Sequence, residues 1–223
     1  MYETIEKTYL VILFISFFCS LVSFRLHYPF YLRFFSIFLG ITVITELIAN
    51  FFLPALHLDS NYPVYNVFLL FQLLSVGYYF KLLIKSSLFR KTIIILMILY
   101  SIFWISNTLF IYKKYDEPHW NSYASMLGDL LIIIFASRYL FELFTGDKLV
   151  SLKRHSEFWI AIGILLFSCC ELPITGIVNF LVRDWDLARR LFAILQILNI
   201  LMYLIFIYAY LCRIKPTVKK SLS

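Results

Sequence analysis

The sequence predicts an all-α integral membrane protein, built as a bundle of seven transmembrane helices. Of its 223 residues, 62% are hydrophobic and only 15% are charged, and the mean hydropathy is +0.85. A typical soluble domain has about 25% charged and about 45–50% apolar residues. The 24 Phe and 16 Tyr residues are too many to bury in one water-soluble domain of this length. The chain therefore needs lipid as its solvent, which excludes soluble enzymes and nucleic-acid-binding domains.

Seven apolar runs are each long enough to cross a bilayer, which takes about 20 mostly apolar residues in a helix. Prolines and charged clusters separate the runs, and the connections are too short to fold into a kinase or cyclase domain. Gly128 and Gly163 lie inside these runs and are predicted sites of close helix packing. We expect one membrane domain over residues 1–223, with helices over residues 8–24, 30–53, 65–84, 92–112, 121–144, 157–181 and 188–212.

The distribution of Lys and Arg predicts the orientation, because cytoplasmic loops carry an excess of these residues. Six of the 20 lie on the side of the predicted N-terminus: Lys7, Lys113, Lys114, Arg183, Arg189 and Arg190. Thirteen lie on the opposite side: Arg25, Arg33, Lys81, Lys85, Arg90, Lys91, Lys148, Lys153, Arg154, Arg213, Lys215, Lys219 and Lys220. Arg138, near the inner end of the fifth run, is the twentieth. We therefore predict an N-terminus outside the cell and a C-terminus in the cytoplasm.

Three acids, Glu46, Asp129 and Glu171, lie well inside the predicted helices. A charged side chain at the centre of a membrane helix costs about 2.5–3.5 kcal/mol on insertion scales, so each acid is a candidate functional group. In the predicted orientation these acids and most amides fall at mid-membrane or in its outer half, whereas the inner halves are mostly apolar. This pattern predicts a polar pocket that opens outward. Its predicted ligand-binding residues are Glu46, Asn50, Gln72, Trp104, Asn107, Asp129, Glu171, Gln196, Asn199 and Tyr203.

A simpler explanation holds for each amide alone, because a hydrogen bond between two membrane helices contributes about 0.6 kcal/mol on average. Hydrogen bonds between helices do not explain three carboxylates at one depth, since like charges and desolvation both oppose their ionisation. We expect either that one acid is protonated and donates a hydrogen bond, or that the pocket holds a cation. Aromatic side chains such as Trp104 and Tyr203 would suit a cation.

The sequence shows no catalytic motif and no metal-ligand or cofactor motif. All four histidines lie in loops on both sides of the membrane, and no Lys inside a helix could form a Schiff base. We expect no catalytic residue, no metal and no cofactor. Asp129 and Glu171 are the pair that an intramembrane lipid-acting enzyme could use as acid and base.

Three functions stay open. The first, which the outward pocket favours, is a receptor-like sensor that signals through a separate cytoplasmic partner on the basic inner face. The second is a proton- or cation-coupled transporter of small molecules, although the sequence shows neither paired repeats nor a second polar zone near the cytoplasm. The third is the lipid-acting enzyme. In all three the other partners are membrane lipids, and we expect no nucleic acid.

Short motifs in four of the predicted helices resemble those of an uncharacterised family of small bacterial seven-transmembrane-helix proteins. These motifs are Glu46 in the second helix, Tyr65-Asn66 opening the third, Glu157-Phe158-Trp159-Ile160 opening the sixth, and Leu198-Asn199 with Tyr203 in the seventh. The resemblance implies a seven-helix fold, a bacterial inner membrane and association with sensory signalling proteins. It implies no catalytic residue.

Overall fold

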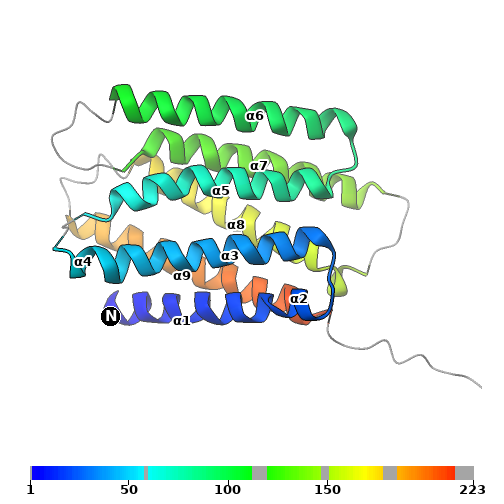
Figure 1. The fold of residues 1–223 in the computed structure, drawn as a ribbon, viewed down its shortest axis with the longest axis horizontal. Coiled ribbons are helices and arrows are strands. Elements are labelled where there is room, and N and C mark those ends of the chain that lie inside the picture. The colour runs from blue at the N-terminus through cyan, green and yellow to red at the C-terminus, as the bar shows by residue number, and fades with distance from the viewer. Residues whose placement is uncertain (1, 58–59, 112–119, 147–150, 178–184, 214–223) are drawn as a thin grey trace, which may run out of the picture.

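A computed structural model of the protein describes residues 2–57, 60–111, 120–146, 151–177 and 185–213. These residues form helices and turns, and none of them is in a strand. The long helices alternate in direction, so the N-terminus and the end of the last helix lie at opposite ends of the bundle, here called its N-terminal and C-terminal ends (Figure 1). The long helices are α1 (Tyr2–Ser20), α3 (Phe30–Leu47), α5 (Tyr62–Leu83), α6 (Ser87–Ser106), α7 (Ser122–Phe144), α8 (Ser156–Ile177) and α9 (Trp185–Leu211).

All of these helices except α7 are long and apolar enough to cross a membrane, which makes six candidate spans in the described part of the chain. Their outer faces expose large apolar side chains, among them Phe18, Ile44 and Ile98. Soluble proteins rarely expose continuous apolar surface of this kind. The chain is therefore a multi-pass membrane protein. Helix α7 has 23 residues and is as long as the others, but it carries three charged residues, Asp129, Arg138 and Glu142.

Several helices begin earlier than the apolar runs predict, and the difference is largest for α1 and α6. Helix α1 begins at Tyr2 and α6 at Ser87, whereas the runs predict residues 8 and 92. In α6 the reason is a helix cap, because the Ser86 hydroxyl accepts a hydrogen bond from the Phe89 amide at 3.3 Å. Charged residues such as Arg90 then continue the helix with their side chains exposed. Residue 112 and residues 178–181 of the predicted helices lie outside the described part.

Helix α3 widens before it ends. It continues as a π-helical turn, η1 (Ile48–Phe52), and a last turn, α4 (Leu53–Ala55). Pro54 has no amide hydrogen to pair with the carbonyl four residues earlier, which favours the wider turn. A second π-helical turn, η2 (Asn107–Ile111), follows α6. The remaining short helices are α2 (Val22–Arg25) and η4 (Leu152–Arg154).

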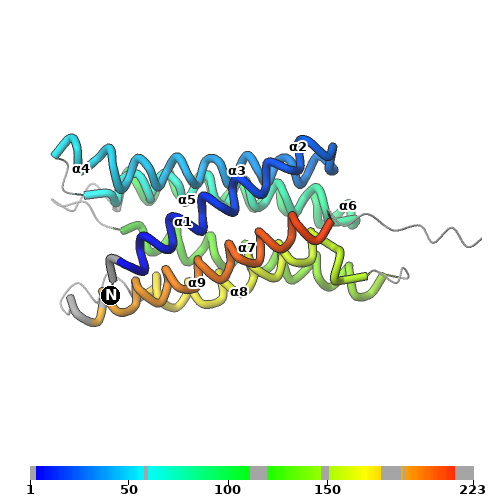
Figure 2. The backbone as a smooth tube through the Cα atoms, turned by 90° about the horizontal axis from the view of Figure 1, so that it is seen from below, coloured from blue at the N-terminus to red at the C-terminus, as the bar shows by residue number. Residues whose placement is uncertain are grey.

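Six of the long helices close a ring around a common interior. In the order α1, α3, α5, α7, α8, α9 each helix contacts the next, and α9 contacts α1, which closes the ring. Figure 2 shows α1 crossing between α3 and α9. Helix α6 lies outside the ring and packs on α5 and α7. Towards the C-terminal end the interior is filled by aromatic rings, where Phe35 contacts Tyr79 and Phe206 with ring centroids 5.0 and 5.1 Å apart.

The structure confirms both predicted sites of close helix packing. A methyl group placed on Gly163 of α8 would lie 3.0 Å from the Phe206 ring and 3.4 Å from Ile205, both on α9. One placed on Gly128 of α7 would lie 3.2 Å from the Tyr100 hydroxyl of α6. Without a side chain, these positions let neighbouring helices approach closely.

We predict that Gly163→Val lowers the stability of the protein by about 1–3 kcal/mol, because overpacking forces α8 and α9 apart. Leu166→Ala is the control, since Leu166 also lies on α8 but is 56% exposed towards lipid. Unfolding of the purified variants in detergent measures the difference. An equal loss in the two variants would contradict close packing at Gly163.

Candidate functional site

A cavity of about 390 Å³ occupies the interior of the ring towards its N-terminal end. Ligand pockets commonly measure about 300–1,000 Å³. Helices α1, α3, α5, α8 and α9 supply most of its wall, with Trp120 from the segment before α7. Val76 and Phe206 line its end next to the aromatic core, here called its floor, and the lining reaches Glu6 and Asn61 at the N-terminal end. The aromatic core therefore lies beyond the floor of the cavity, and the cavity reaches one end of the bundle.

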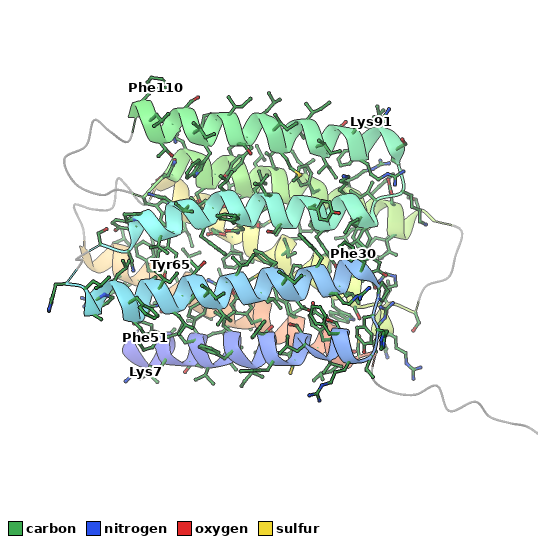
Figure 3. All side chains as sticks on the ribbon, in the orientation of Figure 1. Lys7, Phe30, Phe51, Tyr65, Lys91 and Phe110 are labelled. Atoms are coloured by element: carbon green, nitrogen blue, oxygen red, sulfur yellow. The ribbon has the colours of Figure 1, made fainter. Side chains whose placement is uncertain are left out.

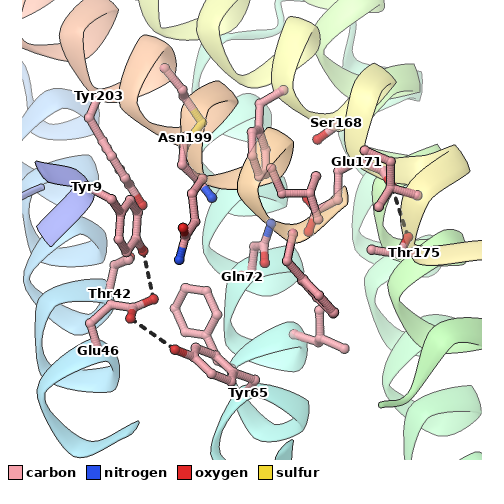
Figure 4. Close-up of a pocket in the computed structure, with 18 of the residues that line it drawn as sticks. Tyr9, Thr42, Glu46, Tyr65, Gln72, Ser168, Glu171, Thr175, Asn199 and Tyr203 are labelled. Atoms are coloured by element: carbon pink, nitrogen blue, oxygen red, sulfur yellow. Dashed lines mark hydrogen bonds between the residues drawn. The ribbon is translucent and has the colours of Figure 1, made fainter. Parts of the chain in front are cut away.

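Three helices meet at the Glu46 carboxylate in the cavity wall (Figure 4). One oxygen accepts a hydrogen bond from the Tyr9 hydroxyl of α1 at 2.7 Å. The other accepts from the Tyr65 hydroxyl of α5 at 3.0 Å and from the Asn50 amide at 2.8 Å. Asn50 lies in the π-helical turn η1, one turn after Glu46. Three donors and no acceptor is the environment that suits an ionised carboxylate.

Three amide side chains face the cavity without a partner. Gln72 of α5 and Gln196 and Asn199 of α9 line it, and none forms a hydrogen bond with a described residue. In Figure 4, Gln72 and Asn199 lie between Glu46 on one side and Glu171 on the other. Unsatisfied polar groups in a membrane interior are costly. These amides are consequently available to a bound molecule or to water.

A second acidic site is formed by Glu171 of α8 and Asp129 of α7. Glu171 lines the cavity, and Asp129, only 3% exposed, lies behind it at the α7–α8 interface. The two carboxyl groups are close enough to form a hydrogen bond with each other when one carries a proton. Glu171 Oε2 and Asp129 Oδ2 are both buried and have no other partner among the described residues.

The structure brings together most of the residues that the sequence predicts for the site. Those that line the cavity are Glu46, Asn50, Gln72, Glu171, Gln196, Asn199 and Tyr203. Asp129 contacts the cavity only through Glu171.

Trp104 and Asn107 lie elsewhere, at the contacts of α6 and η2 with α5 and the start of α7. The Trp104 indole donates to the Asn66 carbonyl at 2.9 Å, and the Asn107 amide donates to Asn121 Oδ1 at 2.5 Å. The reason is the position of α6 outside the ring, which directs its polar side chains towards its two neighbours.

Tyr9 is a site residue that the sequence analysis did not include. A periodic signal was present, because Tyr9, Ser16, Ser20 and Ser23 recur on one face of the first apolar run and all are buried in the structure. A row of serines on one face of a membrane helix does not by itself predict a site, because small residues such as serine are common where membrane helices pack together.

The structure also shows a second group of polar side chains, away from the cavity, that the residue spacing did not predict. At the C-terminal end Glu157 of α8 is only 2% exposed and accepts a hydrogen bond from the Tyr31 hydroxyl of α3 at 2.5 Å. Its carboxylate also lies 3.1 Å from His155 and 3.3 Å from Arg213. We call these residues the Glu157 cluster. Residue spacing alone placed Glu157 at a helix start in the interface, whereas the fold covers it with α3 and the end of α9.

The chemistry of the cavity suits binding more than catalysis. The hydroxyls of Thr42 and Thr175 are bonded to backbone carbonyls of their own helices. His, Cys and Lys are absent from the lining formed by the described residues. Among these same residues no group of three or more metal-ligating side chains is close enough to hold an ion. A comparison of the chain with known protein families, curated proteins and solved structures finds no match.

We predict that Tyr9→Phe and Glu46→Gln are coupled. Each single change should lower stability by about 1–3 kcal/mol, because a hydrogen bond to a buried charged group is lost or mismatched. Their combined loss should be smaller than the sum by about 1 kcal/mol, which a double-mutant cycle in detergent measures.

Tyr62→Phe provides the matched control for this cycle. Tyr62 also lines the cavity, but its hydroxyl has no hydrogen bond to a described residue. Strict additivity of Tyr9→Phe with Glu46→Gln would show that the bond contributes nothing to the fold.

Proposed function

We propose that this chain is a seven-helix membrane sensor, receptor-like in design, that binds a small molecule from outside the cell. The cavity carries this proposal, because a held carboxylate and three unpartnered amides face one enclosed space. The connections between helices are too short for an output domain, so the signal passes to a separate cytoplasmic partner. In agreement with the family that the sequence resembles, we place the protein in a bacterial inner membrane.

In this proposal α7 also crosses the membrane and, with the six candidate spans, brings the number of transmembrane helices to seven. Its 23 residues extend about 34 Å at 1.5 Å per residue, enough to cross the hydrocarbon core. Its charges are sheltered from lipid, because Asp129 faces Glu171 and Arg138 pairs with Glu142 at 2.8 Å. An odd number of crossings puts the two ends of the bundle on opposite sides of the membrane.

The C-terminal end is the cytoplasmic end in this proposal. In Figure 3, Lys91 lies at that end and Lys7 at the other. Exposed basic residues at the C-terminal end are Arg25, Lys85, Arg90, Lys91, Lys153 and Arg154, and they define its basic face. Other residues in the charge count lie outside the described part: Lys113, Lys114, Lys148, Arg183, Lys215, Lys219 and Lys220. The cavity then opens away from the cytoplasm.

A transporter is the second candidate, and the Glu157 cluster is the observation that favours it. A buried acid at each end of the bundle is what a proton- or cation-coupled carrier would use for access from both sides. The aromatic core between the two acids distinguishes the functions, because a sensor can keep it closed, whereas a transporter must open it.

We predict that a Cys at Asn199 reacts with a small impermeant thiol reagent from outside only. The four native cysteines are first replaced, and intact cells are compared with inverted membrane vesicles. Asn199 is reached through the cavity, and the aromatic floor blocks the reagent from the other side. Reaction from both sides would favour the transporter.

Controls at other positions make this result interpretable. A Cys at Asn61 should react from outside and one at Ser87 from the cytoplasm. Asn61 directly precedes α5, and Ser87 begins α6 at the other end of the bundle. A Cys at Ala209, which is fully buried in α9, should react from neither side. Labelling of Ser87 from outside would reverse the proposed orientation.

The basic face should serve output and not folding. It could attract anionic lipid, at about 1 kcal/mol per residue, and dock an acidic partner. We predict that exchanging Lys153 and Arg154 for Glu leaves expression and melting temperature unchanged, because both side chains are exposed. Cross-linking to cytoplasmic proteins should fall in the same variant. An unchanged cross-linking pattern would contradict docking at these residues.

A further inference from the structure

The lining of the cavity is acidic and contains no basic side chain. Of the 28 described residues that form it, three are acids (Glu6, Glu46 and Glu171), and none is Lys, Arg or His. No ion pair joins Glu46, Asp129 or Glu171 to a described cation. The negative charge of this site is therefore not balanced by the described part of the protein.

The charge cannot be removed by pairing the acids with one another. One proton shared by Asp129 and Glu171 still leaves Glu46, whose oxygens are occupied by the hydroxyls of Tyr9 and Tyr65 and the amide of Asn50. These donors fix the position of the carboxylate without neutralising it. A compensating positive charge stabilises a carboxylate in the interior of a membrane protein, and no described residue of the lining supplies one.

The remaining lining matches an organic cation better than a bare metal ion. Ten of the 28 residues are aromatic, so much of the wall is apolar and offers π faces. At the N-terminal end, Trp120 contacts the rings of Tyr62 and Tyr65, with centroids 6.5 and 6.3 Å apart. The described residues do not group the three or more acid, His or Cys ligands that a metal ion prefers.

The unpartnered amides favour a cation that also donates hydrogen bonds. The side-chain oxygens of Gln72, Gln196 and Asn199 can accept from an ammonium group, and Glu171 also lines the cavity with its carboxyl group. Glu171 and Glu46 lie on opposite sides of Gln72 and Asn199 in Figure 4, so the group would meet acceptors from α3, α5, α8 and α9.

We propose that the ligand of the cavity is a small protonated amine carried on an apolar body. This inference rests on the proposed binding function and adds the chemical class of the molecule. The ammonium group lies among Glu46, Glu171 and the amides, and the apolar body contacts the aromatic wall.

The test measures binding to the full chain in nanodiscs of neutral phosphatidylcholine, so that amines are not drawn to anionic lipid. The probes are butylamine, cyclohexylmethylamine and 2-phenylethylamine, each compared with the alcohol and the carboxylate built on the same body. We expect at least one amine to bind about tenfold more tightly than its alcohol, and its carboxylate not to bind. Equal binding of amine and alcohol, or no binding by any amine, would overturn the inference. Saturable binding of sodium, potassium or calcium salts without any amine would overturn it as well.

Variants link the selectivity to the cavity. Glu171→Gln should fold, because Glu171 Oε2 has no other partner to lose, and it should weaken the amine about tenfold while leaving the alcohol unchanged. Glu142→Gln is the matched control, since Glu142 lies at the C-terminal end of α7 and pairs with Arg138. It should bind the amine as the unchanged chain does. Equal weakening in both variants would overturn the assignment to the cavity.

The two proposals fail in different ways. If alcohols bind as well as amines while Asn199→Cys still reacts from outside only, the cavity binds a neutral molecule and only the amine inference is lost. If Asn199→Cys reacts from both sides while an amine binds selectively, the amine inference stands and the sensor proposal is lost.

Discussion

The Glu46 carboxylate connects three helices at the end of the bundle where the cavity lies. Tyr9 of α1 and Tyr65 of α5 donate to it, and Asn50 donates from the next turn of its own helix. In lipid a buried acid without partners would be costly, so these bonds constrain how closely α1, α3 and α5 approach. The cavity is the space left inside the ring once Glu46 is held in this way.

The fold separates apolar packing from polar chemistry along the membrane normal. Aromatic rings fill the interior below the cavity, where Phe35, Tyr79 and Phe206 are almost fully buried. Polar side chains collect above them around Glu46 and Glu171, and again near Glu157 at the opposite end. A molecule in the cavity would thus contact the aromatic core directly through its floor. In a sensor, a shift of Phe206 on α9 would carry occupancy of the cavity towards the Glu157 cluster, where Arg213 follows α9.

Helix α6 differs from the other long helices in its role. It packs outside the ring, and most of its surface faces lipid. Trp104 of α6 bonds to Asn66 near the beginning of α5, and Asn107, the first residue of η2, bonds to Asn121 at the beginning of α7. These bonds hold the ends of the two helices that flank the cavity mouth. Their contribution to the site is consequently support of its wall, and not contact with a ligand.

The amino-acid sequence by itself determined the solvent, the helical class and the candidate polar residues of this protein. Composition alone requires lipid, and a backbone in lipid must satisfy its hydrogen bonds within helices. Helical spacing then places Glu46, Gln72, Glu171 and Asn199 on inward faces, and the structure shows all four lining one cavity.

Only the tertiary structure decided which inward faces share a space. Spacing within a helix says nothing about its neighbours, so α6 could be assigned to the ring although it packs outside. For the same reason Asp129 could not be placed behind Glu171, nor Tyr9 against Glu46. Glu157 is near a helix start in the sequence and would meet water there. It is buried because two segments distant in the sequence cover it. These are α3, which supplies Tyr31, and the end of α9, which is followed by Arg213.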